Sequence, residues 1–426
     1  MRRIRKFVMG DSDESVSPQI YMALAKLRNF QIFPALVKLY IPSFDLHSYD
    51  IPSLSLMSSP TLSILDFSGI SSHPVVFPLL HDISLGCSNI RKITLEGGLD
   101  VRGFKLLGCF PQLESLKLFL DGEIMPSISI NELRPLSKLQ NLKDFELYMD
   151  NLTTFYVPEG SLSTVLAFDA LQLFQITSSA STALQMMQTM SFKFLRRASL
   201  FISSLYPAVD SVAMGLCFQL LVQRYSGTLR DLGVTTGGRL VYISRDVLKC
   251  LTDLAPQLQL LELDVDYIDK ETMDLLTTSK CHFTLQTLRI RSNQPPPDAA
   301  NLQASHIASF ISQFPALQTL RMSVIIDMNA DHVQTMRNIT MHTERLTHPL
   351  RKMLLYPLSY GLDHESNIPV NVTVSTAYVF ARYLNHYFPH LEMVVADYRF
   401  EESVHKWCEW VTTLTKEVQE EVSSNV

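Results

Sequence analysis

Two histidines are the residues whose spacing most suggests metal chemistry. His386 and His390 lie four positions apart, which on a helix would bring two imidazoles to one face, as zinc ligands require. Pro389 stands between them and interrupts a helix at that point. Two ligands also do not complete a zinc shell. The sequence therefore predicts no metal site here.

Three aspartates, Asp264, Asp266 and Asp269, form the second chemical candidate, for calcium binding or general acid–base catalysis. A catalytic carboxylate needs a cleft and a perturbed pKa, and neither can be read from a sequence. Strand alternation places Asp264 outward, and Asp269 precedes a helical pattern as a cap, so a structural role accounts for both. Sequence motifs for phosphate-binding loops, dinucleotide sites and nucleophilic serines are absent. We predict no enzymatic activity and no cofactor.

Composition narrows the class of protein. Of the 426 residues, 46% are hydrophobic and 18% are charged, which excludes intrinsic disorder. The net charge of −6 argues against nucleic acid as a partner, and no apolar run is long enough to span a bilayer. The six cysteines are scattered without a paired motif, which favours a reducing compartment, cytoplasmic or nuclear. The basic N-terminal cluster is interpreted as a solvated edge.

A nine-residue phrase recurs along the chain, most clearly as FPQLESLKL and FPALQTLRM. Both fit the template L-x-x-L-x-L, whose steps run from 23 residues (Ile90 to Leu113) to 41 (Leu350 to Leu391). That spacing is typical of leucine-rich repeats, here stretched and irregular. The first template position is held by Leu36, Leu62, Ile90, Leu113, Leu142, Leu171, Leu195, Leu229, Leu258, Leu285, Leu317, Leu350 and Leu391.

The pattern inside and between the phrases predicts the fold. Apolar residues alternate within each phrase, so each predicts a short strand. In the segments before most phrases, apolar residues recur every three or four positions, which predicts helices. Examples are SPQIYMALAKLRNF, SRDVLKCLTDLA and STAYVFARYLNHYF. Helix and strand in alternation give parallel strands. We predict an α/β leucine-rich-repeat solenoid, with a curved parallel sheet on the concave side and helices only on the convex side.

Proline and cap residues mark the expected element ends. Pro34, Pro111, Pro315 and Pro389 lie between helix and strand, where proline stops a helix. The phenylalanine before each of them is expected to be buried where the helix packs against the strand. Ser244 and Asp269 are expected helix N-caps.

Three segments are expected along the chain. The opening RRIRKFVM fits the template with Ile4, Phe7 and Met9, so residues 1–16 are interpreted as a partial first repeat. Residues 17–399 form the solenoid, and residues 400–426 a capping helix and tail. That helix is indicated by the spacing of Val404, Trp407, Val411, Leu414 and Val418.

The sequence resembles fungal F-box leucine-rich-repeat proteins in four features. These are the phrase F-P-x-L-x-x-L-x-L, the irregular spacing, the RRIRKFVM opening, and the closing FPHLEMVVADYRF with the helix of Trp407 and Trp410. The resemblance implies that the repeats choose a substrate protein for a ubiquitin ligase. It also implies that an N-terminal F-box recruits the ligase adaptor. The F-box pattern is not in this sequence, so an adaptor is expected as a partner only if an F-box lies upstream.

We therefore predict a non-enzymatic module that recognises a protein partner on its concave face. The alternatives are an F-box-independent scaffold and a GTPase-regulating leucine-rich-repeat protein, although the irregular repeats count against the latter. The three arginines of the candidate face would repel one another unless Glu262, Asp264 or an anionic partner neutralises them. A plainer interpretation is that varied polar residues simply cover an exposed sheet. The candidate contact residues are Phe119, Tyr148, Phe201, Asp231, Glu262, Asp264, Arg289, Arg291 and Arg321.

Overall fold

The computed structural model divides the chain into two compact units, Met1–Tyr206 and Pro207–Val426. Each unit is built from parallel strands that follow the order of the sequence. The structure describes residues 4–8, 33–41, 58–67, 76–96, 99, 101–122, 125–150, 152–158, 165–203, 207–236, 243–250, 256–265, 268, 270–292, 304–324, 330–342, 348–357, 374–396 and 402–424.

The described residues of the first unit form eight main strands, and strands of successive phrases within the unit pair in parallel. Their inward side chains stack in columns across the sheet; Leu65, Ile93 and Leu116 are neighbours in one of them. The strands are β1 (Lys6–Val8), β2 (Lys38–Ile41), β3 (Ile64–Phe67), β4 (Lys92–Glu96), β5 (Ser115–Leu120), β7 (Asp144–Met149), β10 (Leu173–Ser178) and β12 (Arg197–Ile202).

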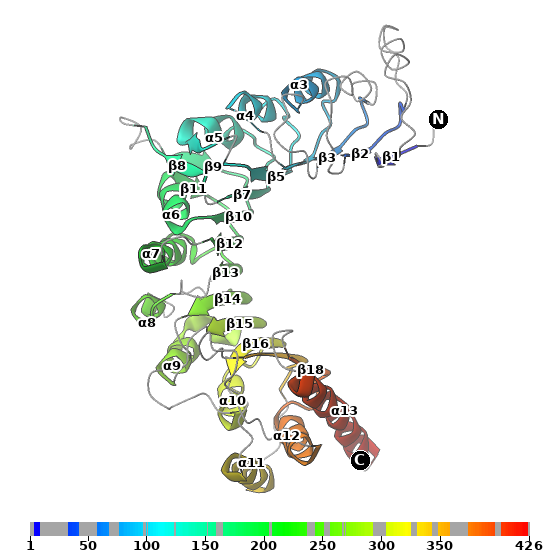
Figure 1. Cartoon of the computed structure of the whole chain (residues 1–426), viewed down its shortest axis with the longest axis vertical. Coiled ribbons are helices and arrows are strands. Elements are labelled where there is room, and N and C mark those ends of the chain that lie inside the picture. Colours follow the sequence, from blue (N-terminus) through cyan, green and yellow to red (C-terminus); the bar gives the residue numbers. More distant parts are fainter. Residues whose placement is uncertain are drawn as a thin grey trace. The chain divides into compact units, whose positions relative to one another are not determined.

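The described residues of the second unit form six strands, which also pair in parallel with one another. Leu261, Leu288 and Leu320 are neighbours in its inner column, and all are fully buried. The strands are β13 (Asp231–Thr236), β14 (Leu260–Val265), β15 (Thr287–Ser292), β16 (Thr319–Val324), β17 (Lys352–Pro357) and β18 (Met393–Ala396). Figure 1 labels β13 to β16 and β18 among them.

Every predicted phrase is a strand of these parallel sheets, and each first template residue from Leu36 to Leu391 is at most 1% exposed. The sequence prediction of one strand per phrase, with parallel pairing, is confirmed. Because the inward positions are apolar at period two, a register shift of one residue would turn the whole column outward. The fold is an α/β leucine-rich-repeat solenoid.

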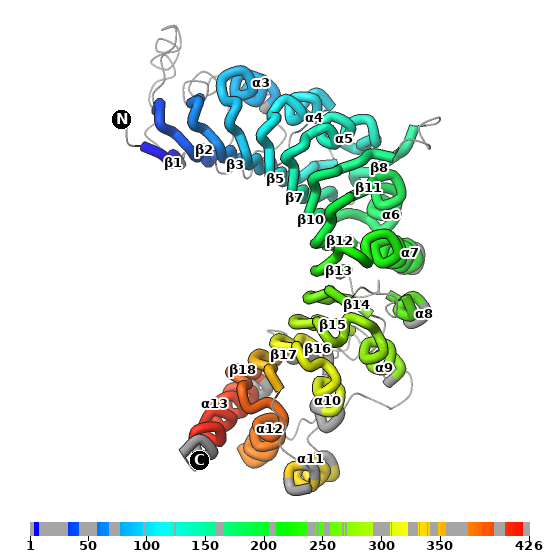
Figure 2. Tube along the Cα trace, turned by 180° about the vertical axis from the view of Figure 1, so that it is seen from behind, coloured from blue at the N-terminus to red at the C-terminus, as the bar shows by residue number. Residues whose placement is uncertain are grey.

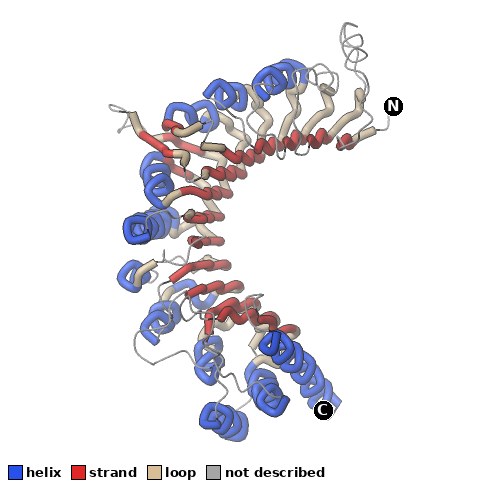
Figure 3. Tube along the Cα trace, viewed as in Figure 1, coloured by secondary structure: helices blue, strands red, loops and turns tan. Residues whose placement is uncertain are grey.

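In both units the helices cover one side of the strands, and the other side stays open (Figures 2 and 3). The helix predicted for SPQIYMALAKLRNF lies outside the described residues, as do Asp266 and Asp269. Ser244 is the N-cap of α8 by position, but its side chain makes no capping hydrogen bond. The helices are α3 (Val76–Gly86), α4 (Val101–Leu107), α5 (Ile130–Ser137), α6 (Ala180–Thr189), α7 (Pro207–Tyr225), α8 (Arg245–Leu248), α9 (Lys270–Thr278), α10 (Ala304–Ile311), α11 (Ala330–His342), α12 (Val374–Tyr387) and α13 (Glu402–Ser424), with a 3₁₀ helix, η2 (Lys280–Phe283).

The first unit departs from the prediction that only helices accompany the main strands. Two small parallel pairs join helical and loop segments there, β6 (Ser127–Ser129) with β8 (Thr154–Tyr156), and β9 (Leu166–Phe168) with β11 (Met190–Phe192). Each strand has three residues and buries one or two of them, for example Ile128 and Phe168. Runs this short are not distinguished from turns by periodicity, which is why the sequence did not predict them.

The recurring F-P-x-L segment is a tight turn that joins helix to strand. The Phe314 carbonyl accepts the Leu317 N–H at 3.0 Å, and the same bond joins Phe110 to Leu113 at 3.1 Å. Proline follows the phenylalanine, at the turn position that its fixed φ suits best. Phe110, Phe314 and Phe388 are at most 1% exposed, as predicted, and Phe33 is half-buried.

Successive turns are also tied to one another, always in the same direction along the chain. The Asn89 and Asn141 side-chain amides donate to the Pro60 and Pro111 carbonyls of the preceding turn, at 2.9 and 3.0 Å. The backbone repeats the arrangement just before the strands: Lys143 N–H and Asp144 N–H both donate to the Glu114 carbonyl, at 2.8 and 3.0 Å. Carbonyl groups of one turn are thereby hydrogen-bonded by the next repeat.

Helix α13 closes the edge of β18. The Thr412 hydroxyl accepts the Val394 N–H at 3.0 Å and donates to the Val394 carbonyl at 2.9 Å. Gln419 donates to the Leu391 carbonyl at 3.2 Å, and Trp407 is fully buried with its ring stacked on Phe380 of α12. A helix thus takes up polar groups that a further strand would otherwise use.

Candidate functional site

The open side of the strands, called the strand face below, carries the outward positions of the repeat template. In the first unit three outward residues form a cluster: Phe119 stacks on Tyr148 with ring centroids 4.2 Å apart. The Lys117 ammonium lies 5.0 Å from the centroids of both rings. All three are half-buried. A cation over stacked rings is a favourable arrangement.

Hydrogen bonds hold this aromatic cluster in place. Gln175 donates its amide to the Tyr148 hydroxyl at 2.6 Å, and that hydroxyl donates to Glu146 at 3.3 Å. Glu146 also pairs with Lys117 at 3.4 Å. Burial and the neighbouring Glu146 carboxylate raise the pKa of Tyr148 above its ordinary value, so the hydroxyl stays protonated as a donor at neutral pH.

Phe201 lies two strands from Tyr148 in the same row, with Thr177 between them. It is 37% exposed. The row therefore presents aromatic rings to solvent on three of its strands, β5, β7 and β12.

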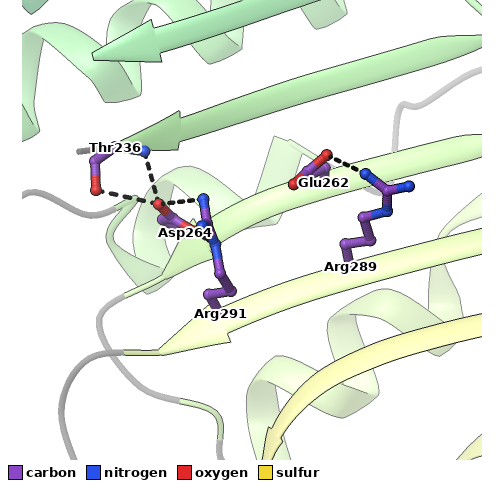
Figure 4. A network of polar contacts seen from close by, with 5 residues as sticks. All are labelled: Thr236, Glu262, Asp264, Arg289 and Arg291. Carbon is purple, nitrogen blue, oxygen red and sulfur yellow. Dashed lines mark hydrogen bonds and ion pairs between the residues drawn. The ribbon is translucent and has the colours of Figure 1, made fainter. Parts of the chain in front are cut away.

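In the second unit, acidic and basic residues pair across adjacent strands (Figure 4). Arg289 on β15 donates an Nη1–H to Glu262 on β14 at 3.0 Å. Arg291 donates two hydrogen bonds to Asp264, from Nε–H to Oδ1 at 2.7 Å and from Nη2–H to Oδ2 at 3.1 Å. The strand register places each pair directly opposite.

Asp264 is the buried anchor of this network, because only 2% of it is exposed. Its Oδ2 also accepts the Thr236 N–H at 2.6 Å and the Thr236 hydroxyl at 3.1 Å. Burial raises the pKa of Asp264, whereas the Arg291 guanidinium and the Thr236 donors act in the opposite direction. Asp264 thus holds Arg291 in position and offers little surface to a partner. The outward position predicted for it is correct, and the exposure that prediction implied is wrong.

Arg321 differs from the other two arginines. It stands beside Arg289 in the register of β15 and β16, as the template predicted. Across the described residues no hydrogen bond or ion pair reaches it, and its Nε is buried without a partner. Glu262 and Asp264 thus neutralise Arg289 and Arg291, whereas Arg321 has no such partner among the residues that the structure describes.

The sequence predicted that all nine candidate residues lie outward on the strands of the concave face. Six of the nine share contacts, in two sets: Phe119 with Tyr148, and Glu262 with Arg289 beside Asp264 with Arg291. Asp231, on β13, is half-buried on the strand face. The sequence analysis did not identify the residues that support these side chains, which are Lys117, Glu146, Gln175 and Thr236. Lys117, Glu146 and Gln175 occupy one template position on successive strands, a signal that an alignment of the phrases contains.

The two histidines considered for metal chemistry do not share a helix. Helix α12 ends at Tyr387, so His390 lies beyond the helix that carries His386, for the reason that the sequence suggested. Within the described ranges, no group of three or more His, Cys, Asp or Glu side chains could hold a metal ion. Nor does any helix there combine the length and apolar character needed to cross a membrane.

The fold and the strand face define a leucine-rich-repeat protein of the α/β kind. No family model and no curated protein matches the sequence. Among solved structures, the chain is similar to the yeast Rad7 and Elc1 complex, with 15% identity over 90% of this chain and 86% of the matched chain, at a TM-score of 0.46. It is also similar to a leucine-rich-repeat protein of Leptospira interrogans, with 13% identity over 93% and 98% and a TM-score of 0.38. Similarities of this size identify no partner or activity for this chain.

Proposed function

We propose that this protein is a non-enzymatic recognition module whose strand face binds another protein. The observation that carries the proposal is a set of partly exposed aromatic and arginine side chains on that face, most of which are fixed in position by contacts to neighbouring side chains. Tyr, Phe and Arg are the types enriched in the cores of protein interfaces. Their ordering by Gln175, Glu146 and Asp264 lowers the conformational entropy that binding would otherwise remove.

The finer proposal is that the repeats act as the substrate-binding part of an F-box ubiquitin-ligase receptor. Its support is the resemblance of the F-P-x-L phrases and of the closing segment to that family. The adaptor is a partner in this proposal only if an F-box precedes the repeats. The alternatives are an F-box-independent scaffold and a GTPase-regulating leucine-rich-repeat protein.

The compartment proposed for this function is the cytoplasm or the nucleus. All six cysteines are thiols, and burial raises the pKa of Cys217 and of Cys408 to about 12. Such buried thiols behave as small apolar residues, which suits a reducing compartment.

Affinity purification of the whole chain with mass spectrometry tests the function, provided that variants locate the surface. We expect Phe201→Asp, on the strand face, to lose partners that the wild type captures. Leu85→Asp is the matched control, because Leu85 is 76% exposed on helix α3. A ligase adaptor among the partners would favour the receptor, and a GTPase the alternative. Partners that are lost with Leu85→Asp and kept with Phe201→Asp would contradict the proposal.

A further inference from the structure

On strands β14 to β16, the strand face of the second unit carries three arginines but only two carboxylates, Glu262 and Asp264. Two of the three arginines on β15 and β16 are paired, Arg289 with Glu262 and Arg291 with Asp264. Arg321 has no carboxylate or other partner in the part of the chain that the structure describes. One positive charge therefore remains at this point of the face.

The surroundings of Arg321 limit what can neutralise it. On one side lies Arg289, whose Nε is also buried without a hydrogen-bond partner. On the other side the register places Leu354 of β17 and then Val395 of β18, both half-buried. A cation held between another cation and an apolar strip gains no neutralising group from its neighbours across the sheet. Arg321 as a whole is half-buried, so part of the residue remains exposed to solvent.

We propose that Arg321 binds the carboxylate of an aspartate or glutamate in the partner protein, with an aliphatic side chain of the same segment against Leu354. The inference rests on the proposed function and names the chemistry of the segment that the face accepts. A guanidinium takes a carboxylate with two parallel hydrogen bonds, and such charge-assisted bonds are among the strongest in proteins. An apolar neighbour in the segment would exclude water from the pair.

A carboxylate is favoured over a phosphate by the way this face treats its other arginines. Each of them is matched by one carboxylate of the chain itself, in one case with two bonds. The uncompensated charge is that of a single guanidinium, which equals the charge of one carboxylate. A phosphate dianion would instead leave an excess negative charge on a partly desolvated surface.

Selection from a phage-displayed library of random 12-residue peptides on the whole immobilised chain tests this inference. The wild type, Arg321→Gln and Arg134→Gln are screened in parallel. Arg134 is exposed on helix α5 and donates a hydrogen bond to Asn131 at 3.3 Å. We expect the wild type and Arg134→Gln to enrich peptides with an acidic residue next to an aliphatic one. Arg321→Gln should bind the best such peptide at least about tenfold more weakly.

A second measurement separates direct recognition from a folding defect. The acidic residue of the best peptide is replaced by its amide, and this change should weaken binding to the wild type but not to Arg321→Gln, whose circular dichroism should match the wild type. Enrichment without acidic preference, or a preference that survives Arg321→Gln, would overturn the inference and leave the proposed function standing. Failure of the wild type to enrich any peptide would count against both.

Discussion

At the scale of single residues, His348 shows how burial sets a protonation state. It is 6% exposed, and its two ring nitrogens have different roles. Nε2 donates to the Phe314 carbonyl at 2.8 Å, whereas Nδ1 accepts the Leu350 N–H at 3.2 Å. This pattern requires the neutral ring, because an imidazolium has no acceptor. Burial accordingly lowers the pKa of His348 below its ordinary 6.5.

Acid should therefore destabilise the second unit through His348. Between its folded-state pKa and about pH 6.5 the unfolded chain binds more protons than the folded chain. The neutral, buried His348 ring therefore contributes to the free energy of unfolding in full above pH 6.5, and this stabilisation is lost as the pH falls through this window. We expect urea unfolding between pH 7.5 and 5.0 to show a shallower dependence on pH for His348→Gln than for the wild type.

The control for this titration is His81→Gln, because His81 is exposed on helix α3. That variant should keep the wild-type dependence on pH. Equal slopes for His348→Gln and the wild type would show that the buried ring does not titrate with unfolding.

At the scale of elements, the sequence predicted most of what the backbone does. Each phrase became a strand because two inward leucines at period two can be buried only in that conformation. What it could not predict depends on tertiary neighbours. Asp264 was predicted to point outward as a candidate contact residue, yet it is buried, because Thr236 and Arg291 bond to it from adjacent strands. Template position alone does not reveal which outward side chains pair.

Helix α13 provides a prediction at this scale. Thr412→Val replaces a hydroxyl by a methyl group of similar shape and leaves the Val394 N–H and carbonyl without their partner. Leaving such groups unsatisfied should cost about 1 to 3 kcal/mol. Hydrogen exchange of the Val394 amide should accelerate accordingly.

The neighbouring Thr413→Val serves as the matched control. Thr413 is exposed, and its hydroxyl bonds only to the Glu409 carbonyl within the same helix. The Val394 amide should keep its protection in this variant. Unchanged protection in Thr412→Val as well would show that the hydroxyl does not hold the strand edge.

At the scale of the whole molecule, stability should be local, since each repeat contacts mainly its neighbours. Leu116→Ala opens a cavity at a fully buried position of β5 and should cost about 2 to 5 kcal/mol locally. We expect faster amide exchange in β4, β5 and β7 and unchanged exchange in β15 and β16. Leu320→Ala should show the reverse. Equal acceleration in both units by either variant would indicate a single cooperative unit.

The one-way bonds between turns also have an electrical consequence. Along a strand, successive peptide groups point to opposite sides, so their dipoles largely cancel. Just before the strands they do not, because consecutive N–H groups of a later repeat, such as those of Lys143 and Asp144, both point back to one carbonyl of the repeat before. Aligned peptide dipoles add, as they do along a helix axis. Within each unit, the margin where the strands begin is therefore polarised from one repeat to the next, positive toward the earlier repeats and negative toward the later ones. A charged group that approaches this margin meets a field whose direction is set by the chain's own order.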